Sequence, residues 1–386
     1  MPSTYLPGAF TQNQFQGSVR TPIYGVAAWS FVNRTPLFTR LPQVPLGAMS
    51  FKTSTTLYRP YTGTITNGAA VTSGLTTFVV ADASVYQPGD TIEALNTAPA
   101  YEEMLITAVV PSTNTLTVVR SYAGTTAGTV ADGSTIYLLS NTRTGGEVNQ
   151  TGISRIPTLA TQWSQTFQHP YHVGGALNAC TDFALPPGVV SVVGREKMGA
   201  IQNCSDDVER ACYYGRPVPI VADTDRPAMG GLRYQLATNN VVAPTSYSAY
   251  KASDLIRDTI ARGFANGGSP DVLLVPAEFQ YAATIWGSAL VRTEAGATKY
   301  GVAIDVFEAP FLNGVDVIPC PLLRPGTYIS LTSAEVRMRV KRNMFDKPRG
   351  STGDADQGDV IFDGALEVDN EHHHAFVSGI TGYSAT

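Results

Sequence analysis

The sequence is short of charged residues. Asp, Glu, Lys and Arg make up 15% of its 386 residues, against 43% hydrophobic residues, so the chain is too apolar to be disordered. A monomeric surface usually carries more charge than this, and we therefore expect contacts with other chains to cover part of the surface. The net charge of −5 gives the chain as a whole no attraction for nucleic acid.

The sequence also lacks a membrane span and a cysteine framework. No run of about eighteen apolar residues occurs, and the opening MPSTYLPGAFTQNQ lacks the basic and apolar parts of a secretory signal. We therefore expect a soluble, cytoplasmic protein with no membrane partner. The four cysteines form no CxxC pair, and Cys204 and Cys212 would lie about 12 Å apart along one predicted helix, too far for a disulfide.

The motifs of the commonest enzymes are missing: GxSxG, GxxxxGK[ST], GxGxxG and HExxH. His169 and His172 could be metal ligands or bases for Cys180, but no orienting group lies nearby in the sequence, so packing is the better interpretation. The acidic stretch 354–359 fails as a calcium loop because Ala365 stands at the twelfth position, and we expect a solvated loop. The sequence predicts no catalytic residue, metal or cofactor.

Three of the five histidines stand in a row, His372 to His374. In a strand, His372 and His374 would share one face and His373 would take the other. Two histidines on one face could hold a metal only with ligands from another strand or subunit. We favour an ordinary strand surface or a subunit contact made by His372 and His374, and we keep metal binding and pH sensing as alternatives.

The first fifty residues are rich in proline and show no sustained helical or strand period, which indicates an extended arm. Its aromatic side chains are too apolar to be left in water, so we expect the arm to lie on the body of the chain or on a neighbouring copy. The candidate subunit-contact residues of the arm are Phe10, Phe15, Trp29, Phe31 and Phe38.

The rest of the chain divides by pattern. From 74 to 140, short β-branched runs alternate with turns, which predicts a small antiparallel barrel or sandwich inserted into a long loop. Residues 189–215 predict a long helix whose polar face includes Glu209 and an Asp206 to Arg210 pair. A helix at 248–265, a buried strand at DVLLVP and a helix at 277–286 predict an α/β unit, and strands follow after residue 300.

The stretch EVRMRVKRNMF predicts a strand with a basic face formed by Arg337, Arg339 and Lys341. Such a face could contact nucleic acid, but pairing with acidic groups of the same or a neighbouring subunit fits the negative net charge better. Asp354 and Asp356, in the acidic stretch that follows, complete the candidate subunit contacts.

This order of parts resembles the major capsid proteins of tailed bacteriophages, whose shell-forming fold is shared with herpesviruses and encapsulins. More closely, it resembles the branch with a β-domain inserted at the extended loop. The stretches that carry the resemblance are GDTIEAL through VVRSYAGTTAGTVADGSTIYLL, VERACYYGR, and GALEVDNEHHHAFVSGITG. The resemblance implies an α+β major capsid fold and self-assembly into the icosahedral head shell of a tailed double-stranded DNA phage.

The resemblance also assigns a place to each segment. It implies an N-terminal arm at 1–50, extended-loop legs at 51–73 and 141–165, an inserted all-β domain at 74–140, a peripheral domain at 166–220 and 321–386 with a spine helix at 189–215, and an axial domain at 221–320. The implied partners are the chain itself in hexamers and pentamers, and scaffold, portal and decoration proteins. Packaged DNA would be bound only weakly at the inner face, in a virion assembled in the bacterial host cytoplasm.

Two other functions stay open at this point. An encapsulin-like compartment shell would use the same fold around a protein cargo. A β-rich adhesin or sugar-binding protein would use 74–140 as its binding domain and would be a monomer, and the long predicted helix argues against it.

Overall fold

The computed structural model describes residues 34–56, 58–97, 100–143, 156–178, 191–221, 225–247, 249–279, 306–307, 314–350 and 353–381. They belong to two compact units. The first, here called the body, joins Met1–Thr55 to Thr158–Thr386, and the second, here called the barrel, is Thr56–Pro157. The chain therefore leaves the body once and returns to it.

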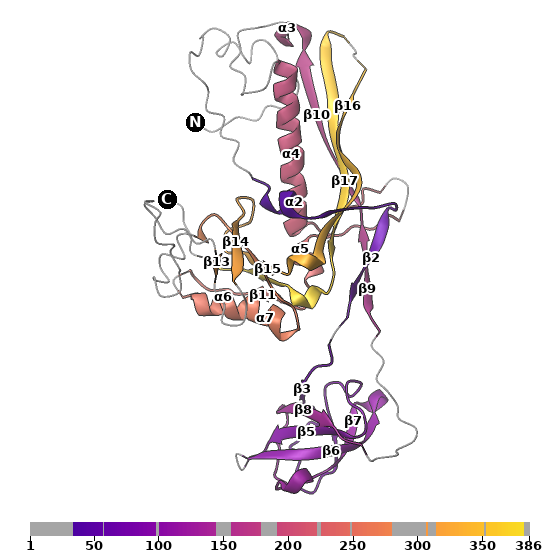
Figure 1. The fold of residues 1–386 in the computed structure, drawn as a ribbon, viewed down its shortest axis with the longest axis vertical. Helices are drawn as coiled ribbons and strands as arrows, with labels where there is room; N and C mark the ends of the chain where they lie inside the picture. The colour runs from indigo at the N-terminus through magenta and orange to yellow at the C-terminus, as the bar shows by residue number, and fades with distance from the viewer. Residues whose placement is uncertain are drawn as a thin grey trace. The chain divides into compact units, whose positions relative to one another are not determined.

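One layer of the body is a four-stranded sheet in the order β1-β16-β17-β10, with α4 along one face (Figure 1). Its strands are β1 (Gln43–Pro45), β16 (Val336–Pro348), β17 (Ala355–Val368) and β10 (Gln165–Gly174). β10 continues into the short helix α3 (Gly175–Asn178), and β2 (Ser50–Thr55) pairs with β9 (Thr158–Trp163) as a separate two-stranded ribbon. The acidic stretch 354–359 is thus mostly the start of β17 rather than a loop.

A second, six-stranded sheet of the body has the order β11-β18-β15-β12-β14-β13. Its strands are β11 (Asn240–Val242), β18 (Ala375–Ser378), β15 (Tyr328–Leu331), β12 (Val272–Val275), β14 (Val315–Pro319) and β13 (Val306–Phe307). β15 and β18, which we expected with the peripheral strands, lie in the same sheet as β12 and β14. They pair with each other, and β15 also pairs with β12, because these strands are apolar and buried.

Short helices accompany this sheet. They are α5 (Leu232–Gln235), α6 (Ala252–Asp258) and α7 (Ile260–Ala265), with single 3-10 turns η4 (Ser333–Glu335) and η5 (Glu371–His373). The single helix predicted at 248–265 is therefore two. It breaks at Thr259, whose backbone is not helical, with φ of −111° and ψ of −82°. The N–H and the hydroxyl of Thr259 both donate to the Leu255 carbonyl oxygen, at 3.0 and 2.5 Å, and so end α6. Most of the helix predicted at 277–286 lies outside the described residues.

The long helix α4 runs from Val192 to Tyr214. It begins where Ser191 Oγ accepts the N–H of Gly194 at 3.0 Å, and it buries Cys204, Val208 and Cys212 in the main core of the body. Cys204 and Cys212 are free thiols, as expected. No helix in the described ranges is long and apolar enough to cross a membrane.

The polar face of α4 differs from the prediction. Asp206 pairs with Arg34 at 3.1 Å, and Arg210 pairs with Asp207 instead of Asp206. Glu209, expected on the polar face, is completely buried. The helical period alone could not show this, because the partners of Glu209 lie far away in the sequence.

Glu209 holds the start of the described chain against α4. Its carboxylate accepts the backbone N–H of Leu37 at 3.0 Å, the N–H of Phe38 at 2.7 Å and the hydroxyl of Tyr213. The two amides belong to α2 (Pro36–Arg40), whose first N–H groups have no partner within the helix. Burial raises the pKa of Glu209, and its three donors offset only part of that effect.

The barrel unit is a six-stranded antiparallel sheet in the order β3-β8-β5-β6-β7-β4. Its strands are β3 (Thr62–Thr64), β8 (Thr135–Asn141), β5 (Asp90–Leu95), β6 (Tyr101–Val110), β7 (Thr115–Val119) and β4 (Thr77–Val79), with turns η1 (Pro111–Thr113) and η2 (Tyr122–Gly124). The two outer strands join beyond their ends, where Ile65 bridges Val80. This closes the sheet around an apolar core of its own. The compact unit begins before the predicted 74 because β3 belongs to the sheet.

One buried ion pair fixes the loops of the barrel. Arg120 donates from Nε and Nη2 to the two carboxylate oxygens of Glu102 at 2.6 and 2.7 Å. Arg120 also donates to the carbonyl oxygens of Thr72, Leu75 and Gly128, so the pair holds two separate loops in place. Burial alone would raise the pKa of Glu102, but the hydrogen bonds that it accepts from Arg120 and from the N–H groups of Gly128 and Ser121 lower it overall.

Replacing Glu209 tests how α2 is held. In Glu209→Ala, two amides and one hydroxyl lose their acceptor, and we expect the free energy of unfolding of the unassembled chain to fall by about 3 kcal/mol. The amides of Leu37 and Phe38 should exchange hydrogen faster. The control Glu196→Ala, on the same helix, should cost under about 1 kcal/mol because, among the described residues, Glu196 makes only a long ion pair with Arg195 at 3.8 Å. Equal losses in the two variants would contradict the anchoring role.

Candidate functional site

The basic face predicted for 337–341 lies on β16 and is paired within the chain. Arg339 donates from Nε and Nη2 to the two oxygens of Glu367 on β17, both at 2.7 Å. Arg337 lies 3.9 Å from Glu367 and 3.5 Å from Asp369. The hydrogen bonds to Glu367 raise the pKa of Arg339, and the Glu367 side chain is only 4% exposed. Arg337 and Arg339 therefore pair with acidic groups of their own chain, and their contact with a second subunit stays a prediction.

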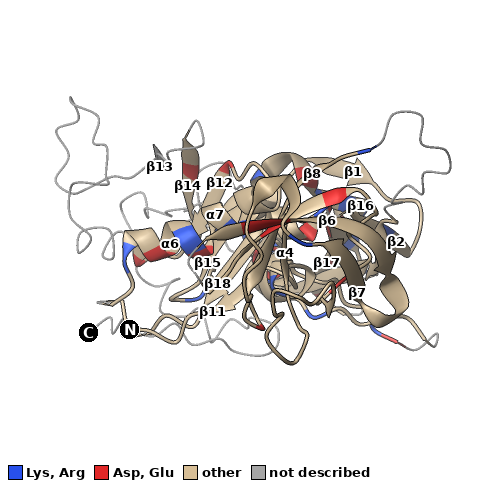
Figure 2. Ribbon diagram, turned by 90° about the horizontal axis from the view of Figure 1, so that it is seen from below, with Lys and Arg blue, Asp and Glu red and all other residues tan. Residues whose placement is uncertain are grey.

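The basic residues that follow on β16 also have contacts within the chain. Arg342 pairs with Asp363, and Lys341, which is exposed, contacts the sulfur of Met49. Charges of both signs also alternate elsewhere, for example along α6, where Arg257 pairs with Asp254 and Asp258 (Figure 2). The arginines of β16 thus form no unpaired basic stripe that would attract the DNA backbone.

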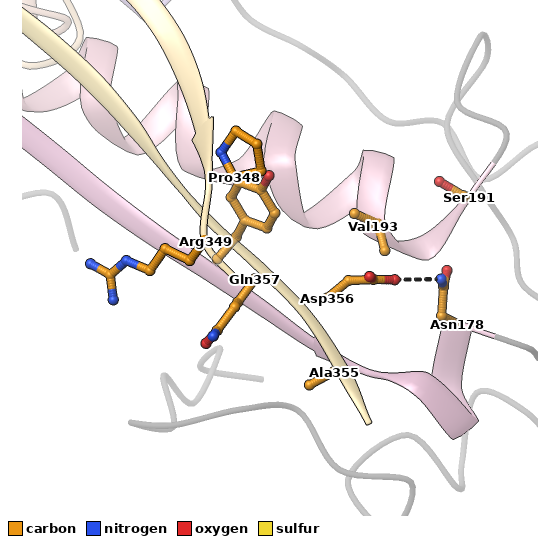
Figure 3. Close-up of a pocket in the computed structure, with 9 residues that line it drawn as sticks. Asn178, Ser191, Val193, Pro348, Arg349, Ala355, Asp356 and Gln357 are labelled. Carbon is orange, nitrogen blue, oxygen red and sulfur yellow. Dashed lines mark hydrogen bonds between the residues drawn. The ribbon is translucent and has the colours of Figure 1, made fainter. Parts of the chain in front are cut away.

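Asp354 precedes the first residue of β17 and Asp356 is its second residue, and both side chains are exposed. Asp356 accepts a hydrogen bond from the side chain of Asn178 at 2.8 Å, and both residues line a cavity of about 370 Å³ (Figure 3). Ser191, Val193 and Gln357 also line this cavity, so it brings the ends of α3, α4 and β17 together. Both aspartates remain candidates for a contact with a second copy.

His169 and His172 both lie on β10, but their side chains have different environments. His169 Nε2 is 2.7 Å from Asp207 on α4, whereas His172 is exposed. Cys180 lies outside the described residues. Within the described part of the chain, no three His, Cys, Asp or Glu side chains come together as a metal site.

The histidine run is not on a strand surface, and that prediction is wrong. His372 and His373 lie in the 3-10 turn η5, and His374 follows directly before β18. His372, His373 and His374 are 1%, 5% and 0% exposed, so none offers a side chain to a second subunit. The chain turns here because Asn370 adopts a left-handed conformation with φ of 47°.

The buried histidines are held by specific contacts. His374 Nδ1 accepts the N–H of Thr332 at 3.1 Å, and its Nε2 lies 3.2 Å from the carbonyl oxygen of Asp369. His373 Nδ1 lies 2.9 Å from both oxygens of Glu335. Burial lowers the pKa of His374 to about 4 and also lowers that of His372, with His373 as the next cause for His372.

The arm residues can be followed only in part. Phe10, Phe15, Trp29 and Phe31 lie outside the described residues. Phe38 is partly buried, and its ring meets that of Phe362 edge-on at a centroid distance of 5.3 Å. This end of the arm therefore packs on the core of its own chain.

The pairing on β16 gives a first test. Arg339→Ala leaves a buried carboxylate without its main partner, and we expect the free energy of unfolding to fall by about 3 kcal/mol. Lys341→Ala, two residues along the same strand, should cost under about 1 kcal/mol because Lys341 is exposed. Urea unfolding of both variants measures the difference. A stable Arg339→Ala protein that has lost affinity for DNA would instead support a nucleic-acid contact.

Protonation of His374 gives a second test. The pKa is about 4 in the folded chain against an ordinary 6.5, so between these values only the unfolded chain binds the proton. Stability should therefore fall as the pH drops from 6.5 to 4, by up to about 3 kcal/mol from this residue. The pH dependence should be shallower in His374→Gln and unchanged in His172→Gln, whose site is exposed. Parallel curves for His374→Gln and the parent would contradict this.

Comparison with known proteins fits the resemblance. A model of the SU10 major capsid protein family matches residues 11–381. No curated protein matches the sequence.

Solved structures with a similar chain include one from Mycobacterium phage Bobi, 12% identical, covering 97% of this chain and 100% of its own, with a TM-score of 0.48. Another is from Microbacterium phage Oxtober96, 10% identical, covering 95% and 98%, with a TM-score of 0.48. A third is a virus-like particle from Pyrococcus furiosus, 9% identical, covering 90% and 93%, with a TM-score of 0.44.

The family match spans nearly the whole chain, and the mixed helices and sheets agree with the α+β capsid fold that the resemblance implied. The chain belongs to the SU10 major capsid protein family and is a phage major capsid protein.

Proposed function

We propose that copies of this chain form the head shell through extended segments that are incomplete in one subunit, and that it has no enzymatic activity. The observation that carries the proposal is the ribbon of β2 and β9. The two strands pair over six residues, from Ser50 opposite Trp163 to Thr55 opposite Thr158. A two-stranded ribbon is marginally stable in water, and Leu159 on its outer half is 56% exposed. A neighbouring copy would cover this apolar side chain.

Each segment of the chain would then have its own role in the shell. The arm before Arg34, with Phe10, Phe15, Trp29 and Phe31, would lie across a neighbouring copy. The α4 layer would form the peripheral domain, and the six-stranded sheet would contribute to the axial domain, whose loops meet in hexamers and pentamers. The barrel would be the inserted domain and would face outward. Exposed Asp354 and Asp356 would contact a further copy.

The charge of the chain indicates how it would interact with packaged DNA. The net charge of −5 and the internal pairing of Arg337, Arg339 and Arg342 suit a shell wall that holds packed DNA and binds it only weakly. Scaffold, portal and decoration proteins would be the other partners, and assembly would take place in the bacterial host cytoplasm before the chain becomes part of the virion.

Electron microscopy with sedimentation velocity tests assembly. At low micromolar concentration the chain, with its scaffold if needed, should give closed shells or capsomer rings. Leu159→Asp should fold normally, since this side chain is mostly exposed, and should assemble at least tenfold less. The control Asn203→Asp adds the same charge at an exposed site on α4 and should assemble like the parent.

The outcomes separate the proposals. If Leu159→Asp forms normal shells, the proposed contact between the ribbon and a neighbouring copy is wrong. If the parent chain stays a stable monomer even with scaffold added, the proposed assembly through extended segments is wrong, and the adhesin alternative is favoured. Shells that enclose a protein cargo rather than DNA would favour the compartment alternative.

A further inference from the structure

The outer face of the barrel carries the exposed Tyr101 on β6, the exposed Leu95 on β5 and the half-buried Tyr137 on β8. Side chains alternate along these strands, so Ile92, Ala94 and Ile136 point into the core while their neighbours point outward. Leu95 pairs with Tyr101 across β5 and β6, and Tyr137 pairs with Glu93 across β8 and β5. Tyr101 is 54% exposed and Leu95 is 46% exposed, which is unusual for such large apolar side chains.

A cavity of about 380 Å³ opens on this face. Its lining combines two aromatic rings and an aliphatic side chain with small polar groups, and none of the lining residues is charged. The lining includes Leu95, Thr97, Tyr101, Ser134, Thr135 and Tyr137. Hydroxyl groups can both donate and accept hydrogen bonds, and the tyrosine rings offer flat apolar surfaces. Such a lining complements a ligand that has both apolar faces and many hydroxyl groups.

The surrounding charge narrows the ligand class. Glu93 and Glu103 pair across β5 and β6, two residues along the strand from Leu95 and Tyr101, so their side chains lie on the same face. Two carboxylates beside the cavity disfavour phosphates, sulfated or sialylated sugars and nucleic acid. Carboxylates also accept hydrogen bonds from hydroxyl groups, which a neutral sugar supplies.

The spacing of the rings suits a chain of sugars rather than one. Tyr101 and Tyr137 lie on strands separated by β5, so their backbones are about 10 Å apart across the two strand spacings. They are also about 7 Å apart along the strands, because Tyr101 is opposite Leu95 and Tyr137 is opposite Glu93. Leu95 lies between them on β5.

We propose that this face of the barrel binds a neutral oligosaccharide, with Tyr101 and Tyr137 stacking on sugar rings and Thr97, Ser134 and Thr135 bonding to hydroxyl groups. The proposal goes beyond the shell function and does not depend on it, because the site lies within one barrel. A particle that carried this site outward would hold many weak copies of it, and these together could retain it on a glycan-coated surface.

Saturation-transfer NMR on the full-length protein tests the proposal, since it detects weak binding to a large protein. The probes are neutral glucose, galactose, mannose and N-acetylglucosamine oligosaccharides of three to six units, with sulfated and sialylated oligosaccharides as the charged comparison. At least one neutral series should give saturation transfer, and the charged series should give none.

Three variants locate the binding. Tyr101→Ala should raise the dissociation constant at least tenfold, and the double variant Tyr101→Ala/Tyr137→Ala should abolish saturation transfer. The control Tyr58→Ala removes an equally exposed tyrosine of the same unit, 60% exposed and outside the cavity, and should change affinity less than twofold. Sedimentation of each variant shows separately whether shells still form.

Several results would overturn the proposal. They are no transfer to any neutral series, transfer that survives the double variant, and stronger transfer to the charged series. Loss of assembly in the double variant without any sugar binding would show that the face is a contact between protein chains instead.

Discussion

The pairing of β16 with β17 is the constraint on which the body depends. The two strands run antiparallel from Val336 opposite Val368 to Pro348 opposite Gly358. β10 pairs with the other edge of β17 along its length, β1 pairs with β16, and α4 packs on the sheet (Figure 1). The Arg339–Glu367 pair lies within this hairpin, so its charges are satisfied without any outside partner. Beyond Val368 the chain turns through the buried histidines into β18 of the second sheet.

The histidine turn shows how a short motif can mislead. The alternation of a strand predicted an exposed face, but the run sits where one sheet ends and another begins. Gly263 and Gly268 allow this close packing, because a Cβ at either position would lie within 3 Å of His373 atoms. No local pattern in the sequence predicts that three adjacent polar rings are buried, since the contacts come from Thr332, Glu335 and Asn239. Burial lowers the pKa of His372 and His374, so protonation of these two rings would oppose folding.

The sequence predicted the larger organisation better than individual sites. Periodicity was enough for α4 and for the all-β character of the barrel, because both depend on local patterns that repeat over many residues. It was not enough for Glu209 or Glu102, whose partners Leu37 and Arg120 come from other elements. Nor could it place β15 and β18, since a short apolar strand fits either sheet and only the tertiary pairing decides between them. A carboxylate inside an otherwise good amphipathic pattern, as in VERACYYGR, is the one signal that could have marked Glu209 as buried.

The register of the ribbon has a consequence for how such a chain can change over time. Thr55 and Thr158 are the last paired residues of β2 and β9, and all of the barrel lies between them in the sequence. Because the two ends are already adjacent, a two-residue hairpin turn could replace the whole insert without altering the register of the ribbon. Because the body and the barrel each have an apolar core of their own, loss or replacement of the insert in evolution would leave the core of the body intact.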